Sequence, residues 1–254
     1  MVQSLSYLWR LLATALAFGL FGLGGLVLRL VVFPLQSLWP GDPGWRRARA
    51  RRTISRMFWL FTQFMYRSGI LTFTVEGGER LGRPGQLIIA NHPSLIDVVL
   101  LIACIRDANC VVKQSLFHNP FTRGPVRAAG YLSNGSAEIL DDAEAALRRG
   151  ETLVVFPEGT RTTPGTMPSF HRGGAAIALR GAQMITPVVI TVDPPTLTKG
   201  EPWYRIPKCR VHFQLCVGDD IDPGQFAALG LPPVASRKLN QHLHDYFRQQ
   251  LETV

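Results

Sequence analysis

The chain has 254 residues, of which 46% are hydrophobic, enough for one domain of ordinary size with extra segments. Its net charge of +9 by itself would suggest a nucleic-acid partner. Six arginines in one short run account for most of this net charge, and no aromatic-studded basic sheet motif accompanies them, so we expect no nucleic-acid partner.

The N-terminal region is apolar. Residues 11–28 contain no charged side chain, and this stretch is about long enough to cross the hydrocarbon core of a bilayer. The apolar character resumes over residues 30–39, where Pro34 interrupts it. Only Arg10 precedes the apolar stretch, which argues against a cleaved signal peptide. We expect residues 1–45 to be a retained membrane anchor; a single span, a hairpin and an interfacial anchor all remain open.

A basic stretch follows the anchor directly. It contains six arginines, and such clusters beside membrane segments stay on the cytoplasmic side, near anionic headgroups. Apolar residues then recur at helical spacing over residues 53–69, so we expect residues 46–69 to form a basic stretch and an amphipathic interfacial helix. Packing of this helix on the domain core is the alternative. The pattern predicts attachment to the cytoplasmic membrane, with the following domain facing the cytoplasm.

Residues 70–254 alternate between strand-like and helical patterns. Such alternation predicts an α/β domain with a mixed, largely parallel central sheet flanked by helices. The strands are expected at residues 71–75, 87–90, 110–113, 152–156, 184–192 and 210–217, and the helices at residues 95–105, 138–149, 172–180 and 236–251.

His92 and Asp97 stand at a predicted strand-to-helix junction. Pro93 is expected to open the helix, which would place His92 at the positive end of the helix dipole, where a neutral imidazole is favoured. Asp97 lies about one turn further and would bond the other ring nitrogen, so the pair would activate a hydroxyl. The alternative is structural, because Ser94 and Asp97 have the spacing of a helix-capping pair.

A second group of polar residues follows the strand predicted at 152–156. Glu158, Gly159 and Arg161 emerge together at the C-terminal end of this strand, where ligand sites of open α/β sheets gather. Glycine permits close backbone approach, and a guanidinium grips phosphate through two parallel hydrogen bonds. Taken alone, the segment also fits a polar turn with an exposed ion pair.

The four cysteines form no C-x-x-C pair, and we expect buried free thiols in a reducing compartment. The histidines outside the His92 segment have no companions at ligand spacing. We therefore expect no metal site.

The two polar segments together resemble the glycerolipid acyltransferase family, typified by bacterial lysophosphatidate acyltransferase. The family hallmarks are N-H-x-x-x-x-D followed by F-P-E-G-T-R, and residues 91–97 and 156–161 match both in the expected order. Residues 170–173 are similar to the F-K-x-G block and residues 185–188 to the last motif block. The resemblance covers roughly residues 70 to 220 and is more specific than either motif alone.

The resemblance implies direct acyl transfer without an enzyme ester. His92 would deprotonate the acceptor hydroxyl, Asp97 would orient His92, and the oxygen would attack a thioester of acyl carrier protein or coenzyme A, which serves as co-substrate. No other cofactor and no metal are implied, and the partners are membrane lipids and the thioester carrier. The polar head of the acceptor would be held by four residues: Glu158, Gly159, Thr160 and Arg161. Secondary candidates are Asn91, Ser94, Lys113, Ser136 and His171. The oligomeric state is left open.

The chain departs from the family pattern at two cationic positions. Ser136 stands where G-x-I-F-I-x-R has its arginine, and His171 replaces the lysine of F-K-x-G. Fewer cationic contacts weaken the binding of a phosphomonoester. We therefore expect an acceptor other than lysophosphatidate itself, either a different lyso-lipid or a hydroxylated lipid.

Two other functions compete with acyl transfer. Ser94 would be the nucleophile of a serine-type lipid or thioester hydrolase, although no G-x-S-x-G elbow surrounds it. A non-catalytic membrane-anchored lipid-binding protein would keep the fold without the chemistry.

Overall fold

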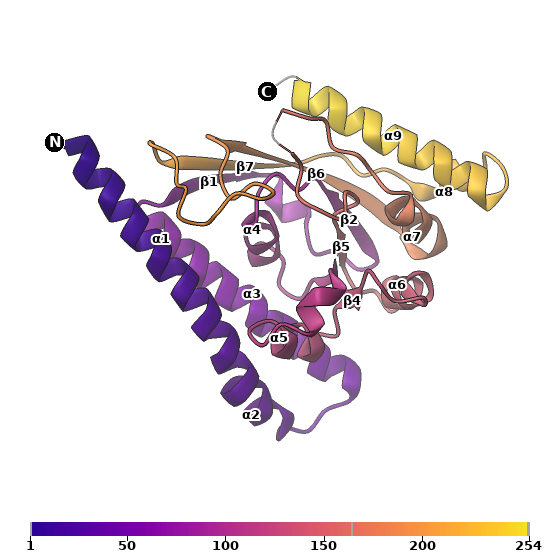
Figure 1. The fold of residues 1–254 in the computed structure, drawn as a ribbon. Helices are drawn as coiled ribbons and strands as arrows, with labels where there is room; N and C mark the ends of the chain where they lie inside the picture. Colours follow the sequence, from indigo (N-terminus) through magenta and orange to yellow (C-terminus); the bar gives the residue numbers. More distant parts are fainter. Residues whose placement is uncertain (1, 164, 253–254) are drawn as a thin grey trace.

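The central sheet organises the domain. The structure is a computed structural model that describes residues 2–163 and 165–252. In this part of the chain, a seven-stranded sheet has the order β1-β7-β6-β2-β5-β3-β4 (Figure 1). All neighbouring strands are parallel except β6 and β7, so the expected mixed, largely parallel sheet is confirmed. The strands are β1 (Leu71–Glu76), β2 (Gln86–Ala90), β3 (Asn109–Val112), β4 (Leu132–Ser133), β5 (Leu153–Val155), β6 (Met184–Asp193) and β7 (Val211–Val217).

Helices cover both faces of the sheet, and strand β2 explains why both layers are needed. Its side chains alternate, so that Ile88 and Ala90 join one apolar cluster while Leu87 and Ile89 join the other. The first cluster includes residues of helices α3 (Pro43–Arg67) and α4 (Asp97–Ala103). The second includes residues of α6 (Ile139–Arg148), α7 (Gly173–Gly181) and α9 (Pro232–Glu252). The central strands are therefore buried on both faces.

The apolar N-terminal region is almost entirely helical. Helix α1 (Val2–Val27) continues through a π-helical segment (Leu28–Val32) into α2 (Phe33–Ser37). Pro34 lies in the first turn of α2, directly after the π-helical segment, and the chain stays helical through the expected interruption. By length and composition, the helical stretch Leu5–Ser37 is able to cross a membrane, and only 22% of its most apolar window is buried.

The basic stretch and the amphipathic helix form one continuous helix, whereas the sequence predicts a helix over residues 53–69 only. Helix α3 begins at Pro43 and runs through all six arginines to Arg67, with the Asp42 side chain accepting a hydrogen bond from the backbone N–H of Trp45 at 3.0 Å. The sequence pattern located the apolar half of this helix only. Capping at Asp42 starts the helix about ten residues earlier, because arginine is a good helix former.

Several short elements were not predicted from the sequence. They are β4, α5 (Arg123–Ala128), α8 (Pro223–Ala227) and two 3₁₀ turns (Gly78–Arg80 and Gln114–Phe117). Elements of two to six residues contain too few positions to show a period. The four cysteines are free, as expected, but Cys104 and Cys209 are exposed rather than buried.

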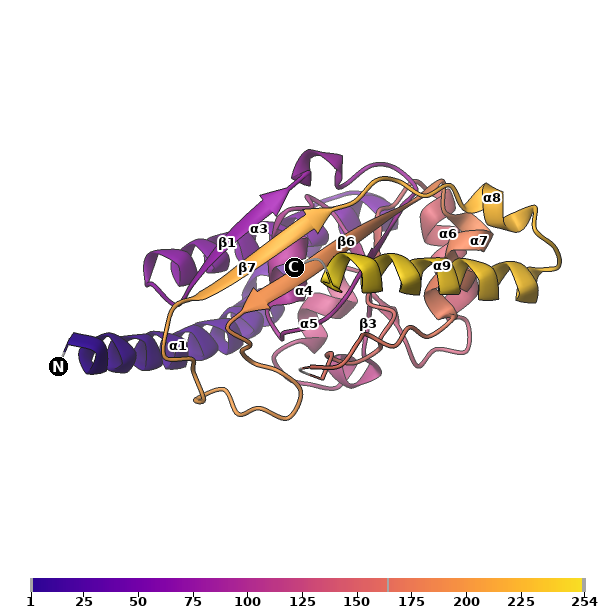
Figure 2. The same cartoon turned by 90° about the horizontal axis from the view of Figure 1, so that it is seen from above.

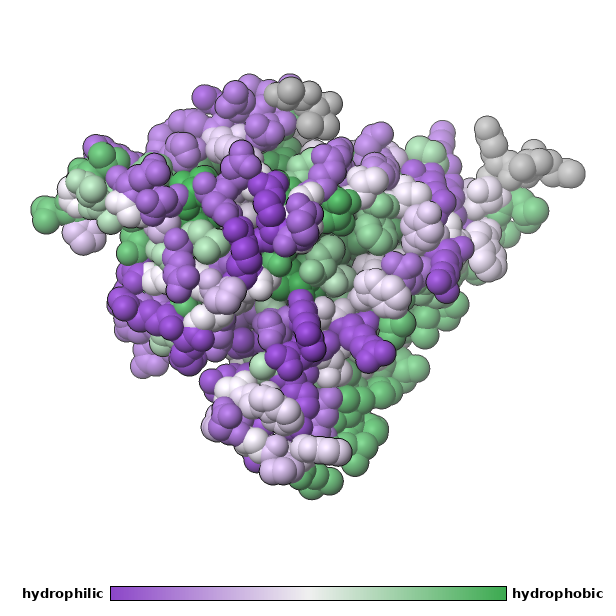
Figure 3. All heavy atoms as spheres, turned by 180° about the vertical axis from the view of Figure 1, so that it is seen from behind, coloured by the Kyte–Doolittle hydropathy of each residue, from purple (hydrophilic) through white to green (hydrophobic). Residues whose placement is uncertain are grey.

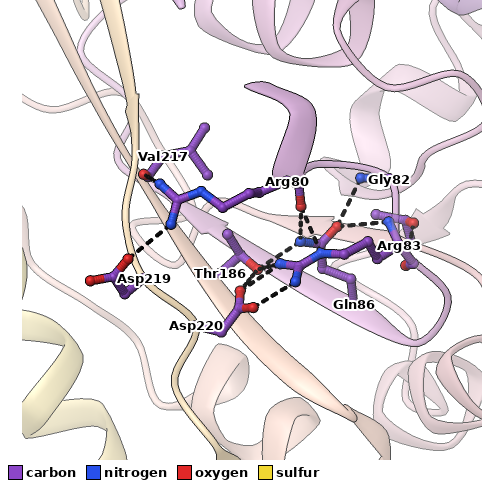
Figure 4. Close-up of polar contacts among 9 residues, drawn as sticks. Arg80, Gly82, Arg83, Gln86, Thr186, Val217, Asp219 and Asp220 are labelled. Atoms are coloured by element: carbon purple, nitrogen blue, oxygen red, sulfur yellow. Dashed lines mark hydrogen bonds and ion pairs between the residues drawn. The ribbon is translucent and has the colours of Figure 1, made fainter. Parts of the chain in front are cut away.

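The edge at which β2 and β6 begin, which we call the amino edge, carries a network of charged side chains (Figure 4). Arg83 donates two hydrogen bonds of 2.6 Å to the two carboxylate oxygens of Asp220, and Arg80 bonds Asp219 at 2.9 Å. Gln86, at the start of β2, donates to Thr186 on β6 at 2.7 Å. This network ties the start of two central strands to the segment that follows β7.

Candidate active site

The motif residues gather at the opposite edge of the sheet, the carboxyl edge. Strands β6, β2, β5, β3 and β4 run in the same direction, so their C-terminal ends meet at this edge. His92 follows β2, Lys113 follows β3, Ser136 follows β4, and the segment from Glu158 to Arg161 follows β5. The topology thus places residues from four separate parts of the chain along one edge, where ligand sites of open α/β sheets usually lie.

His92 and Asp97 are in direct contact. The Nδ1 atom of His92 lies 3.0 Å from Oδ2 of Asp97. The side chain of His92 is 18% exposed, whereas that of Asp97 is fully buried, and the Phe156 ring lies 4.7 Å from the imidazole centre. An ionised Asp97 accepts a hydrogen bond from Nδ1–H of His92, which leaves Nε2 free to accept a proton from another molecule.

The local geometry differs from the sequence expectation in one respect. Helix α4 begins at Asp97, with Ile96 as its N-cap, so Pro93 does not open the helix and His92 lies in the preceding loop. Oδ2 of Asp97 also accepts the backbone N–H of Ser94 at 2.6 Å. The Ser94–Asp97 hydrogen bond and the contact with His92 therefore exist together, because one carboxylate oxygen accepts both hydrogen bonds.

Burial raises the pKa of both carboxyls at this edge. It raises the pKa of Asp97 to about 6, against the opposing effect of the hydrogen bond with His92. Burial also raises the pKa of Glu158, opposed by hydrogen bonds from the Thr162 hydroxyl and the His92 backbone. Two carboxylates with raised pKa values beside a histidine are typical of a functional site.

Glu158 holds the His92 loop in place. Its Oε1 accepts the backbone N–H of His92 at 2.7 Å, and both of its oxygens lie within 2.9 Å of the Thr162 hydroxyl. The backbone N–H of Thr162 in turn donates to the His92 carbonyl at 2.8 Å. The two motif loops are therefore bonded to each other directly. A role of Glu158 in holding an acceptor stays a prediction.

The remaining residues of the second motif differ in their surroundings. Gly159 is exposed and has a φ of 63°, a left-handed conformation that favours glycine. Thr160 is half-buried. Arg161 donates from Nη1 to the backbone carbonyls of Leu197 and Thr198, at 2.7 and 2.9 Å. His171 is exposed, and its ring lies next to Gly159.

Asn91 and Ser94 are both buried and bonded to backbone. The Asn91 side chain bonds the N–H and the carbonyl of Ile190 on β6, at 2.7 and 2.8 Å. The Ser94 hydroxyl donates to the Thr196 carbonyl at 2.8 Å, and the residue is 0% exposed. Each side chain fixes one flank of His92, and neither presents a free group to solvent.

Lys113 and Ser136 lie at the outer part of the edge, beyond β5. Lys113 is exposed, and Ser136 is half-buried, with its hydroxyl accepting the backbone N–H of Glu138 at 3.2 Å. A neutral hydroxyl thus occupies the position where the family pattern has an arginine.

Thr162 and the segment 196–198 were missed by the sequence analysis. Thr162 carried one local signal, since it stands four residues after Glu158, just beyond the motif. The segment 196–198 carried none, because it meets the motif loops only through tertiary contacts. Among the described residues, no group of three or more His, Cys, Asp or Glu side chains is arranged to hold a metal ion.

The chain is similar to known acyltransferases. A family model described as acyltransferase matches residues 72–191. A 1-acyl-sn-glycerol-3-phosphate acyltransferase of Cocos nucifera is 32% identical over 126 residues, which cover 46% of this chain and 41% of the relative. The enzyme of the same name from Saccharomyces cerevisiae is 34% identical over 132 residues, covering 48% of this chain and 43% of the relative.

A lyso-ornithine lipid O-acyltransferase of Pseudomonas aeruginosa is 30% identical over 126 residues, covering 48% of this chain and 48% of the relative. The chain thus spans about half the length of the curated relatives it matches. Its fold is that of a crystal structure of the 1-acyl-sn-glycerophosphate acyltransferase PlsC from Thermotoga maritima, with a TM-score of 0.75 and 20% identity, covering 99% of this chain and 97% of that chain. The segment that matches the acyltransferase family model, residues 72–191, contains His92, Asp97, Glu158 and Arg161.

Proposed function

We propose that the protein is a membrane-associated O-acyltransferase, which moves a fatty acyl group from a thioester to the hydroxyl of a lyso-phospholipid or related lipid. One observation carries the proposal: the imidazole of His92 contacts the fully buried Asp97 at 3.0 Å within the segment that matches the acyltransferase family model. This arrangement supplies a base whose tautomer is set by a carboxylate.

The reaction begins with proton transfer. Nε2 of His92 accepts the proton of the acceptor hydroxyl while Nδ1–H donates to Asp97, which stabilises the imidazolium that forms. The acceptor oxygen attacks the thioester carbonyl carbon. The C–S bond then breaks, and the leaving sulfur takes the proton from His92. The products are an ester and a free thiol, either on acyl carrier protein or on coenzyme A.

A serine-type hydrolase is a weaker candidate. A nucleophilic serine needs an accessible hydroxyl beside a base. Ser94 is 0% exposed, and its hydroxyl donates to the Thr196 carbonyl. Its environment favours a structural role.

The exposed apolar surface supports membrane association. A band of large apolar side chains follows α1 and α2 along one border of the molecule (Figure 3), and it continues onto α3. It is made of exposed residues that include Leu8, Leu12, Leu16, Leu23, Leu30, Leu35, Leu38, Trp39, Met57 and Leu60. Such a patch on a water-soluble surface marks a contact with lipid or protein.

The contacts of α1 with the domain favour an interfacial anchor over a perpendicular span. Trp9 donates from its ring to the Ser68 carbonyl at 2.8 Å, and Arg29 donates to the Pro120 carbonyl at 3.1 Å. Twenty helical residues separate these contacts, which is about 30 Å, the thickness of the hydrocarbon core. A perpendicular helix would carry polar loops of the domain into lipid. We propose that the helix lies in the cytoplasmic face of the cytoplasmic membrane.

The charges around the site favour one class of acceptor. Ser136 and His171 replace the arginine and the lysine of the family pattern, and Nη1 of Arg161 is bonded to two backbone carbonyls. Fewer free cations favour an acceptor without a phosphomonoester. Lyso-ornithine lipid is a suitable test compound, because one relative carries that lipid in its name.

The proposal is tested by measuring acyl transfer by the purified full-length chain in vesicles. Acyl-carrier-protein and coenzyme A thioesters serve as donors, and lysophosphatidate, lyso-ornithine lipid and neutral lyso-lipids as acceptors. We expect ester formation in the wild type, with a loss of about 1,000-fold in His92→Ala. His242→Ala is the matched control, because His242 is exposed on α9, away from the carboxyl edge.

Equal inactivity of the wild type and His92→Ala with the whole panel would favour a non-catalytic lipid-binding protein. Faster turnover with lysophosphatidate than with any other acceptor would refute the proposed acceptor class while leaving acyl transfer in place.

A further inference from the structure

The loop between β6 and β7, residues 194–210, contacts both the helix α1 and the His92 loop. It leaves the sheet at the carboxyl edge and extends toward α1 before returning as β7 (Figure 2). Residues 199–210 contain no helix or strand, so interactions at the two ends of the loop determine its position.

At the site end, the loop is bonded to both motif segments. Its Thr196 carbonyl accepts the Ser94 hydroxyl at 2.8 Å, and its Leu197 carbonyl accepts the backbone N–H of Leu95 at 3.2 Å and Nη1 of Arg161 at 2.7 Å. Leu197 is buried and has a φ of 51°, which is unfavourable for a leucine. A strained residue of this kind persists only where its surroundings hold it.

At the other end, the loop is held by a cation of α1. The guanidinium of Arg10 donates to the backbone carbonyls of Pro207, Lys208 and Cys209, and Arg10 is only 7% exposed. A buried cation is costly unless it is hydrogen-bonded, so these contacts hold the loop and α1 together. The ring of Phe18, two turns further along α1, lies 5.7 Å from that of Trp203.

We propose that Arg10 is a positioning residue for catalysis. It fixes the far end of the β6–β7 loop, and the loop places the carbonyls of Thr196 and Leu197 against Ser94 and Leu95. These two residues lie within the turn that brings Asp97 onto His92. The position of α1 on the domain thereby affects the position of the His92 imidazole. The expected effect of Arg10 on turnover rests on the proposed function, whereas the structural coupling between Arg10 and the His92 loop does not depend on it.

Hydrogen–deuterium exchange of the full-length protein in phosphatidylglycerol-containing vesicles tests this coupling. In Arg10→Gln, we expect amides of both 203–209 and 94–98 to exchange about fivefold faster or more, because hydrogen bonds to a charged group are lost. Arg29→Gln is the matched control, since Arg29 lies on the same helical stretch and bonds a carbonyl outside the loop. It should leave the exchange of 94–98 unchanged.

In the acyl-transfer assay, kcat of Arg10→Gln should fall about fivefold while the KM for the thioester stays within about twofold, and Arg10→Lys should restore part of kcat. Faster exchange confined to 203–209 would overturn the proposal, as would an equal effect of Arg29→Gln on 94–98. Should Arg10→Gln fail to fold, Phe18→Leu must show the same pattern. The exchange result decides the coupling even if no acyl transfer is found, so the two failures are distinguishable.

Discussion

At the amino edge of the sheet, Asp220 is held by two short hydrogen bonds from Arg83, whereas at the carboxyl edge Asp97 is fully buried beside the imidazole of His92. The consequences for the two carboxyls are opposite. The hydrogen bonds from Arg83 lower the pKa of Asp220, and burial raises the pKa of Asp97 to about 6. The first arrangement stabilises the native state, and the second destabilises it once Asp97 is ionised.

This contrast indicates that the carboxyl edge, where we propose that catalysis takes place, contributes less to the stability of the native state than the amino edge. Oδ1 of Asp97 receives no hydrogen bond from the described residues, while both oxygens of Asp220 are bonded. Ion pairs in which every charged atom is hydrogen-bonded are common in structural networks. A buried carboxylate beside a histidine with one oxygen left unbonded lowers stability and is more typical of a functional site. Four predictions test this division between the two edges.

The largest effect is expected for Asp97→Asn. The change removes the carboxylate that orients and stabilises the His92 imidazolium, so kcat should fall about 1,000-fold. Above about pH 6 the thermal midpoint should be maintained or rise, because an amide carries no buried charge. Assays and calorimetry at pH 8 measure both quantities. A large fall in the thermal midpoint would mean that Asp97 is needed for the fold, and the contrast between the edges would then be wrong.

Arg83→Met should lower stability and leave activity nearly unchanged, the reverse of Asp97→Asn. It removes the two-point pair with Asp220 and should lower the free energy of unfolding by about 1–2 kcal/mol, a modest value because the pair is partly exposed. We expect kcat to change less than about twofold. Arg148→Met is the control, since Arg148 forms an exposed pair with Glu144 that contributes little to stability. A loss of kcat without a loss of stability in Arg83→Met would place function at the amino edge as well.

Acidification should separate activity from folding. As pH falls through about 6, the Asp97 carboxylate takes up a proton and no longer accepts the charge-assisted hydrogen bond from Nδ1–H of His92, so kcat should fall about tenfold per pH unit. Protonation of Asp97 favours the native state, because its pKa is higher when folded. The pKa of Asp220 is lowered on folding, so the stability from its pair is present above the ordinary carboxyl pKa and is lost only in stronger acid.

A pH profile of kcat and a parallel pH profile of the far-ultraviolet circular dichroism check that activity is lost at a higher pH than the fold. Activity and fold lost together near pH 6 would contradict it.

Among the changes at the carboxyl edge, the smallest effect on activity is expected for Ser94→Ala. Removing the hydroxyl leaves the buried Thr196 carbonyl without its 2.8 Å partner, which should cost about 1–2 kcal/mol of stability. Acyl transfer should decline less than about fivefold, because His92 and Asp97 remain in contact. A loss comparable to that of Asp97→Asn would instead favour a serine nucleophile and the hydrolase alternative.

Much of the fold was predictable because strands and helices of the α/β domain are long enough to show their periods. The predicted strands at residues 71–75 and 184–192 match β1 and β6 closely. The boundaries of α3 and α4 were wrong, since Asp42 caps the first helix and Ile96 precedes the second. Helix ends depend on single capping residues, which carry little signal in a sequence.

The candidate site was also predictable only in part. The spacing of His92 and Asp97 was readable because the two lie five residues apart, and the structure brings them together. The partners of Glu158 and Arg161 were not readable, since the His92 backbone and the carbonyls of Leu197 and Thr198 lie far away in sequence. Backbone groups are present at every residue and therefore leave no pattern.

The sequence by itself determined the apolar N-terminal region, the alternating α/β pattern and the two motifs, because each depends on residue types at short spacings. Only the tertiary structure decided that Glu158 clamps the backbone of His92, that Arg161 bonds the β6–β7 loop, and that Arg10 connects this loop to α1. These contacts join segments more than thirty residues apart, and their positions follow from the parallel strands that end at one edge of the sheet.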